Sequence, residues 1–185
     1  MIILEGLDGV GKSTIVEHLK RFGFSNLHYD YDSANNDLIK KYSSISNRTD
    51  LNNLIADRSF FSEMVYGTVL RGGSRISDEQ FVELLKLYAS LDVKVIYLTS
   101  DKEVLLKRRQ EDKKDFDMLN SKYMELNDKY GQIMNLAAKY LPVLHIDTSE
   151  KSMEQTFKQC EDFVFGGRID ERTLWYCVCW KYFYR

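Results

Sequence analysis

The chain has 185 residues, of which 44% are hydrophobic and 29% are charged, and its formal net charge is −2. A chain of this length can form one domain with a full core, and so small a net charge gives no general attraction to nucleic acids or membranes. No apolar run is long enough to span a bilayer, and we expect no secretory signal in the first residues. We therefore expect one cytoplasmic domain over residues 1–185, with small molecules rather than polymers or membranes as partners.

The first predicted strand, residues 1–4, leads into a glycine-rich segment and a helix predicted over residues 12–22. Residues 6–13 fit the pattern of Gly, four residues, Gly, Lys and Ser or Thr that defines a phosphate-binding loop. The glycines let backbone N–H groups turn toward phosphate oxygens, and the helix start adds partial positive charge. We expect a nucleoside triphosphate to bind at Gly6, Asp8, Gly9, Val10, Gly11, Lys12, Ser13 and Thr14. Lys12 would reach the outer phosphates and Ser13 would ligate Mg²⁺; the alternative is a turn that only joins strand to helix.

Further strand-like and helix-like segments alternate along the chain. Strands are predicted over residues 27–31, 53–56, 93–98 and 143–146, and helices over residues 38–42, 60–70, 78–90, 102–109, 117–140 and 152–165. Such alternation is typical of a parallel sheet. We predict an α/β, three-layer fold of the P-loop NTPase class, with a five-stranded parallel sheet and helices on both faces. Ligands of such sheets bind beyond the carboxyl ends of the strands. Capping boxes at residues 77–80 and 100–103 predict two helix starts.

An acid and a base, Asp57 and Arg58, follow the predicted third strand. Arg58 can bind an acceptor phosphate through two parallel hydrogen bonds, and Asp57 can bind Mg²⁺ or a water on it. The structural alternatives are that Asp57 caps the next helix and that Arg58 pairs with a surface acid. Because the pair ends a strand in a chain with a phosphate loop, we expect Lys12, Asp57 and Arg58 to be catalytic, with Ser13 and Asp57 as metal ligands.

Together these segments resemble the thymidylate kinase family. The resemblance covers residues 1–155 and rests on residues 5–14, 57–58 with Ser62 and Tyr66, 70–75, 97–108 and 145–149; residues 63–81 are similar to a compact subgroup of thymidylate-kinase-like proteins. It implies ATP- and Mg²⁺-dependent phosphorylation of a (deoxy)nucleoside 5′-monophosphate, with dTMP or another pyrimidine deoxynucleotide as acceptor, in nucleotide biosynthesis. The chain departs from the family at residues 28–37, where an Arg-Glu-Pro-Gly-Gly-like segment is missing.

The resemblance also implies how the acceptor binds. Asp8 would accept a hydrogen bond from the sugar 3′-hydroxyl, Arg58 would bind the phosphate, and Tyr66 would crowd the sugar against a 2′-hydroxyl. Ser62 and Glu63 would lie near the base. Glu63 replaces an amide, and a carboxylate can only accept, which suits a pyrimidine N3–H or a cytosine amino group. The alternatives are that Asp8 bonds its own turn, that Tyr66 is a core aromatic residue and that Glu63 lies on the helix surface.

Two further segments carry predictions. Residues 108–116 resemble the family's mobile lid, and Arg108 matches the arginine that ends the preceding helix, so we add Arg108 to the catalytic and ATP-binding residues. The alternative is a solvated helix end with favourable cations. Residues 166–185 form an aromatic extension beyond the resemblance. We expect it to pack on its own domain, with a homodimer contact as the alternative.

Two other functions fit the same residues. A deoxynucleoside kinase has Glu-Arg-Ser where this chain has Asp57-Arg58-Ser59, and its acid would take the proton of a neutral 5′-hydroxyl. A nucleotide-binding regulatory module would bind the same ligand without transferring phosphate.

Overall fold

The computed structural model describes residues 1–28, 37–111 and 113–166. Its strands form one parallel sheet in the order β2-β3-β1-β4-β5. The strands are β1 (Ile2–Gly6), β2 (Ser25–His28), β3 (Leu54–Asp57), β4 (Lys94–Thr99) and β5 (Val143–Asp147). The helices are α1 (Lys12–Lys20), α2 (Leu38–Ser43), α3 (Phe60–Arg71), α4 (Asp78–Ser90), α5 (Lys102–Arg108), α6 (Lys113–Ala137) and α7 (Met153–Phe165), with short 3₁₀ turns η1 (Ser44–Asn47) and η2 (Leu51–Asn53). The predicted five-stranded parallel sheet is confirmed.

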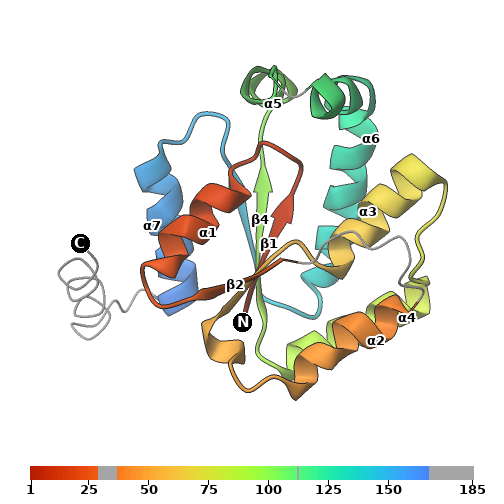
Figure 1. The fold of residues 1–185 in the computed structure, drawn as a ribbon, viewed down its shortest axis with the longest axis vertical. Helices are drawn as coiled ribbons and strands as arrows, with labels where there is room; N and C mark the ends of the chain where they lie inside the picture. The colour runs from red at the N-terminus through yellow and green to blue at the C-terminus, as the bar shows by residue number, and fades with distance from the viewer. Residues whose placement is uncertain (29–36, 112, 167–185) are drawn as a thin grey trace.

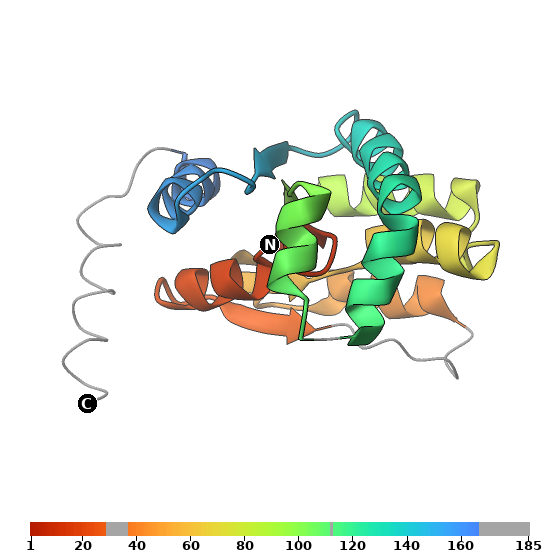
Figure 2. The same ribbon diagram turned by 90° about the horizontal axis from the view of Figure 1, so that it is seen from above.

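Helices cover both faces of this sheet. In Figure 1, α1 and α7 lie on one face and α3 and α6 lie on the other, with α2 beside α4. Figure 2, seen from above, places β2 and β5 at opposite edges of the sheet, between the same two groups of helices. The predicted three-layer arrangement is therefore confirmed.

The apolar sequence of β1 explains its central place. β1 pairs in parallel with β3 on one side and β4 on the other, and every residue of β1 is buried. A strand covered on both faces needs apolar side chains on both faces, which Ile2, Ile3 and Leu4 provide. The register of the three strands brings the carboxyl end of β1 beside the ends of β3 and β4. The loop after β1 therefore lies at the edge of the sheet where we expected ligands.

Some predicted boundaries differ from the structure. The helix predicted over residues 117–140 begins earlier, at Lys113, and ends at Ala137. The strand predicted over residues 27–31 is Ser25–His28, and residues 29–31 lie outside the described part. The aromatic extension also lies outside it, except for Gly166, which ends α7 with a left-handed backbone. In the described parts of the chain, no helix has both the length and the apolar character needed to cross a membrane.

One of the two predicted capping boxes is wrong. The box at Ser77 is confirmed, because the Ser77 hydroxyl accepts from the N–H of Gln80 and the Gln80 side chain accepts from the N–H of Ser77. The helix predicted to start after Ser100 instead has Asp101 as its N-cap residue. The backbone N–H of Asp101 donates to Ser149 Oγ at 2.8 Å. A side chain from the β5–α7 loop therefore binds the start of α5 in place of the predicted local cap.

Candidate active site

The loop between β1 and α1 has the backbone of a phosphate-binding loop. Gly6, Gly9 and Gly11 have positive φ angles of 141°, 87° and 102°. A side chain at Gly6 would also place its Cβ 2.2 Å from the carbonyl oxygen of Leu98 in β4, so only glycine fits there. Gly11 directly precedes α1 and lets the chain turn sharply into the helix. The three glycines therefore shape the loop as the sequence pattern requires.

Lys12 is folded into this loop. Its side chain is buried, and Nζ donates to the carbonyl oxygens of Gly6 at 3.0 Å and Leu7 at 2.8 Å. Burial, together with the positive charge of Arg58, lowers the pKa of Lys12 to about 8. An ammonium group held between loop carbonyls lies where it can bind an anion in the loop.

Hard oxygen donors lie beside the loop. Ser13 is exposed in the first turn of α1, and Asp57 ends β3 opposite Leu4 of β1. Among the described residues, no three His, Cys, Asp or Glu side chains are close enough to hold a metal ion. Mg²⁺ needs no such cluster, because it commonly keeps several waters and binds one or two protein oxygens together with substrate phosphates. The hydroxyl of Ser13 and the carboxylate of Asp57 fit that donor set.

Asp8 and Arg58 form the centre of the site. Arg58 Nη2 pairs with Asp8 Oδ1, and the hydroxyl of Tyr66 donates to Asp8 Oδ2 at 3.3 Å. The guanidinium of Arg58 lies over the ring of Tyr66, 5.1 Å from its centroid. Arg109 Nη2 is 3.9 Å from Asp8 Oδ1. Burial alone would raise the pKa of Asp8, but the nearby cations, first Arg58, outweigh burial and lower it. Asp8 is therefore an ionised carboxylate that contacts one arginine and lies near a second.

The backbone of Arg58 is unusual. Its φ angle is 72°, a left-handed conformation that residues other than glycine rarely adopt, and its N–H donates to the carbonyl of Leu4 at 3.0 Å. Such conformations cluster at functional sites because the surrounding structure must hold them in place. The N-cap of α3 is Ser59, so Asp57 does not cap that helix. Arg58 pairs with a partly buried acid rather than with the surface acid considered above.

Glu5 is a site residue that the sequence analysis did not assign. It is completely buried, and its carboxylate accepts from the N–H of Ser59 at 2.7 Å, Ser62 Oγ at 2.7 Å and the hydroxyl of Tyr130 at 3.2 Å. Burial raises its pKa despite these bonds and the charge of Arg58. Ser62, predicted near the base, contacts Glu5 and also accepts from Arg58 Nη1 at 3.3 Å. The sequence signal that could have identified Glu5 is a charged residue near the end of an otherwise apolar strand.

Glu63 forms ion pairs with two arginines. It is 7% exposed, so the alternative of a surface position is wrong. Arg71 Nη2 lies 2.5 Å from its carboxylate, and Arg75 donates to it from Nη2 at 3.1 Å and from its backbone N–H at 3.0 Å. Burial would raise the pKa of Glu63, but the hydrogen bonds from Arg75 and Arg71 lower it. Gly67 makes room, because a Cβ there would lie 2.8 Å from Arg71 Nη2 and 2.9 Å from the Cα of Ser74.

Arg108 joins the phosphate loop to the β5–α7 loop. Its Nη1 donates to the carbonyl of Gly9 at 3.1 Å, and its Nη2 donates to the carbonyl of Thr148 at 3.0 Å. A cavity of about 200 Å³ opens beside these contacts, with Thr14 and Met153 also in its wall. α5 ends at Arg108, a turn covers residues 109–111, and residue 112 of the predicted lid lies outside the described part.

Apart from Asp57 and Glu63, the predicted residues fall into three adjoining groups. The loop residues Gly6 to Thr14 lie with Arg108; Asp8, Arg58 and Tyr66 contact one another; and Ser62 lies with Glu5. Glu63 is set apart with its own arginines. The arrangement can hold a polyphosphate in the loop and a second anion at Arg58.

The chain matches no protein-family model and no curated protein. Among solved structures it is similar to the YorR protein from Bacillus subtilis in complex with phosphorylated GDP, with a TM-score of 0.74 and 24% identity, covering 89% of this chain and 95% of that one. It is also similar to deoxyadenosine kinase from M. mycoides with bound dCTP, with a TM-score of 0.58 and 18% identity over 90% of this chain and 100% of that one. Shikimate kinase from Acinetobacter baumannii in complex with shikimate is similar with a TM-score of 0.53 and 17% identity, covering 91% of this chain and 94% of that one. At these identities the likeness shows that the fold is that of the P-loop kinases.

Proposed function

We propose that this protein transfers the γ-phosphoryl group of ATP to a nucleoside 5′-monophosphate, with dTMP or another pyrimidine deoxynucleotide as acceptor. The observation that carries the proposal is the cationic group around Asp8, where Arg58 pairs with the carboxylate and Arg109 lies 3.9 Å away, next to a phosphate loop. Phosphoryl transfer between two anions depends on cations that bring them together. The YorR structure holds phosphorylated GDP and deoxyadenosine kinase holds dCTP, which supports nucleotides as the ligands.

The donor would occupy the phosphate loop. Lys12 would bind the outer phosphates, and Ser13 and Asp57 would hold Mg²⁺, which when bound would offset the negative charge of those phosphates. The cavity of about 200 Å³ beside Gly9 and Thr148 adjoins the loop and would take part of the rest of the donor nucleotide. Arg108, which already joins the two loops around this cavity, would contact the bound ATP.

The acceptor would lie on the side of Arg58. Arg58 would bind its phosphate, while Asp8, oriented by Arg58 and Tyr66, would accept a hydrogen bond from the sugar 3′-hydroxyl. Tyr66 would crowd a 2′-hydroxyl. The pair Arg71 and Arg75 supplies hydrogen-bond donors that a lone carboxylate at Glu63 cannot. Hydrogen-bond donors of this kind suit the carbonyl groups of thymine or uracil, which supports a pyrimidine as the base of the acceptor.

The chemistry requires little proton transfer. A monophosphate acceptor is already an anionic nucleophile, so the protein needs to align it with the γ-phosphoryl group and to offset charge. We propose that the end of α5 and the turn after it act as the lid, with Arg108 and Arg109 approaching the phosphates from that side. Closure would keep water from reacting with ATP.

A second candidate is a deoxynucleoside kinase, supported by the likeness to deoxyadenosine kinase. A neutral 5′-hydroxyl must lose a proton during transfer, and Asp57, which ends β3 directly before Arg58, would accept it. Glu5 is completely buried and would instead hold Ser59 and Ser62 in place. The product of the reaction separates the candidates, since one makes diphosphates and the other makes monophosphates.

Product analysis with labelled ATP tests the proposal. The protein is incubated with γ-labelled ATP, Mg²⁺ and each common nucleoside or nucleoside 5′-monophosphate, and the products are separated by chromatography, with Lys12→Met as the background control. We expect label in dTDP or another pyrimidine deoxynucleoside diphosphate. Label only in monophosphates formed from nucleosides would support the second candidate instead. Binding of ATP without label in any acceptor would indicate a regulatory module.

A further inference from the structure

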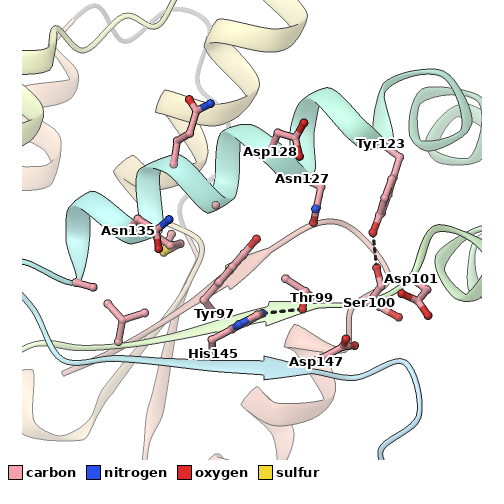
Figure 3. Close-up of a pocket in the computed structure, with 15 residues that line it drawn as sticks. Tyr97, Thr99, Ser100, Asp101, Tyr123, Asn127, Asp128, Asn135, His145 and Asp147 are labelled. Carbon is pink, nitrogen blue, oxygen red and sulfur yellow. Dashed lines mark hydrogen bonds between the residues drawn. The ribbon is translucent and has the colours of Figure 1, made fainter.

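A second and larger cavity lies between α6 and the strands β4 and β5 (Figure 3). Its volume is about 800 Å³, against about 200 Å³ for the cavity beside the phosphate loop. Tyr123 and Asn127 extend from α6 toward the strands, and Tyr97 extends from β4 toward the helix. This volume is within the range of small-molecule sites, which is about 300–1,000 Å³.

The cavity exists because one face of β5 is left open. β5 is an edge strand that contacts α7, while α6 packs against α3 and α5. His145 of β5 is consequently exposed although it belongs to the sheet. On the helix side, Gly131 has no side chain, and nothing lies within 4 Å of the Cβ that another residue would place there. The space between helix and strands is therefore not filled by packing.

Aromatic rings on the strands form a fixed floor. Tyr97 and His145 are cross-strand partners whose rings stack with centroids 5.0 Å apart and an interplanar angle of 22°. Tyr97 also stacks with Tyr130, with centroids 5.7 Å apart. His145 Nε2 is bonded to Thr99 Oγ1 at 2.8 Å, which fixes the orientation of its ring. Because Tyr97 is buried, the exposed ring of His145 is the one that a ligand can cover, and its flat surface favours a flat ligand.

The wall of the cavity is acidic. Among the described residues it contains Asp101, Asp128 and Asp147 and no lysine or arginine. Burial raises the pKa of the Tyr123 hydroxyl, and the charges of these three aspartates raise it further, so the local potential is negative. Phosphates are repelled by such a wall and cations are attracted. The flat ring that lies on the floor of the same cavity favours an extended organic cation.

A buried hydroxyl in the same wall has no partner. Ser100 is 3% exposed, and within the described part of the chain its Oγ makes no hydrogen bond. A buried polar group without a partner costs stability, and a rotation of this side chain toward a ligand or a water in the cavity would remove that cost. This observation is independent of the acidic residues.

We propose that this cavity, which we call the acidic cavity, binds a small organic cation with a planar unsaturated body, such as an amidinium or a protonated amino-heterocycle. The exposed ring of His145, backed by the buried ring of Tyr97, would lie against the planar body, and the aspartates would offset its charge. The site is separate from the phosphate loop and does not depend on the proposed phosphoryl transfer.

Three probes of nearly equal shape and different charge test the proposal. Benzamidine is a cation at neutral pH, benzamide is neutral and benzoate is an anion, and each is titrated into the ¹⁵N-labelled full chain and followed by NMR. We expect benzamidine to shift the Gly131 amide signal and to bind about fivefold more tightly than benzamide, with no shift from benzoate. Equal affinity for the three probes, or shifts confined to other parts of the chain, would overturn the proposal.

Matched variants locate the probe. Gly131→Leu places a side chain in the cavity and should abolish benzamidine binding, while Gly131→Ala should reduce it less. Both leucine and alanine favour a helix more than glycine, so α6 should be retained.

Charge variants test the role of the aspartates. Asp128→Asn should weaken benzamidine binding about threefold and leave benzamide binding unchanged. Asp117→Asn removes the same charge from α6 outside the cavity wall and should have no effect. Lys12→Met should lose phosphoryl transfer and keep benzamidine binding. Unchanged benzamidine binding by Gly131→Leu, or equal effects of Asp128→Asn and Asp117→Asn, would contradict the assignment.

Discussion

Two regions beside the sheet carry opposite charge. The phosphate-loop centre, at the carboxyl ends of β1 and β3, brings Lys12, Arg58 and Arg109 around Asp8. The acidic cavity, between α6 and the strands β4 and β5, carries aspartates and, among the described residues, no lysine or arginine in its wall. The first region lies where side chains converge beyond the carboxyl ends of parallel strands, and the second lies along the uncovered face of an edge strand. The comparison teaches that the fold decides where a ligand can bind, and the charges decide which ligand.

The largest expected effect comes from removing the cation inside the phosphate loop. Lys12→Met should lower kcat for phosphoryl transfer by about 10²–10³-fold, because the charge that offsets the outer phosphates is lost. A coupled ADP assay measures it. Lys20→Met is the matched control, since Lys20 lies on the same helix, outside the phosphate loop, and pairs with Glu17. Near-normal turnover by a folded Lys12→Met protein would remove the basis for calling this region catalytic.

The next effect concerns the acceptor half of the same centre. Arg58→Ala should lower kcat/KM for the acceptor by about 100-fold while changing ATP affinity little, since the proposed partner of Arg58 is the monophosphate. Steady-state kinetics and calorimetry with ATP separate the two quantities. Arg48→Ala, which removes an exposed arginine paired with Asp50, is the control. A loss of ATP affinity as large as the loss of acceptor use would place Arg58 on the donor side.

A smaller effect is expected at the base. Glu63→Gln should change the ranking of dTMP, dUMP and dCMP by about fivefold, the equivalent of about 1 kcal/mol, because Arg71 and Arg75 lose the charge that orients them. Relative kcat/KM values for the three acceptors measure it. Glu79→Gln, on an exposed residue of α4, is the control. An unaltered ranking would show that this cluster lies away from the base.

The smallest expected effect is the uptake of a fraction of a proton by Lys12 when ATP binds. Because the pKa of Lys12 is about 8 in the free protein, its ammonium loses its proton as pH rises through that value. Bound phosphates favour the charged form, so ATP binding should take up roughly three-quarters of a proton at pH 8.5 and about a tenth at pH 7. ATP affinity should fall as pH rises above 8. Calorimetry in buffers of different ionisation enthalpy measures the uptake, and equal values at both pH values would mean that Lys12 keeps its proton in the free protein.

The phosphate loop and the order of elements could be predicted because their signals are local. The glycines of residues 6–11 and the lysine after them are adjacent in the sequence, and the structure gives those glycines the positive φ angles that the pattern requires. The five strands are likewise short apolar runs, and their predicted positions match the structure to within a few residues.

The rest of the candidate site depends on contacts between distant residues. Glu5 meets Tyr130 across 125 positions of the sequence, so neither residue alone predicted the cluster. Glu63 was interpreted through the helix it lies on, whereas its partner Arg75 comes from the segment after that helix. The capping box predicted at Ser100 failed for the same reason, since Ser149 supplies the hydrogen bond from another loop. Local sequence patterns therefore predicted the strands, most helices and the phosphate loop, whereas the side-chain contacts of the site depend on residues that are distant in the sequence.

The central claim is that two phosphorylated molecules bind end to end, one in the phosphate loop and one at Arg58. A bisubstrate analogue in which adenosine and thymidine are joined by five phosphates tests it most directly by isothermal titration. We predict that the analogue binds at least about 100-fold more tightly than ATP or dTMP alone, and that Arg58→Ala removes most of this gain. An affinity no better than that of ATP, unchanged in Arg58→Ala, would contradict the account.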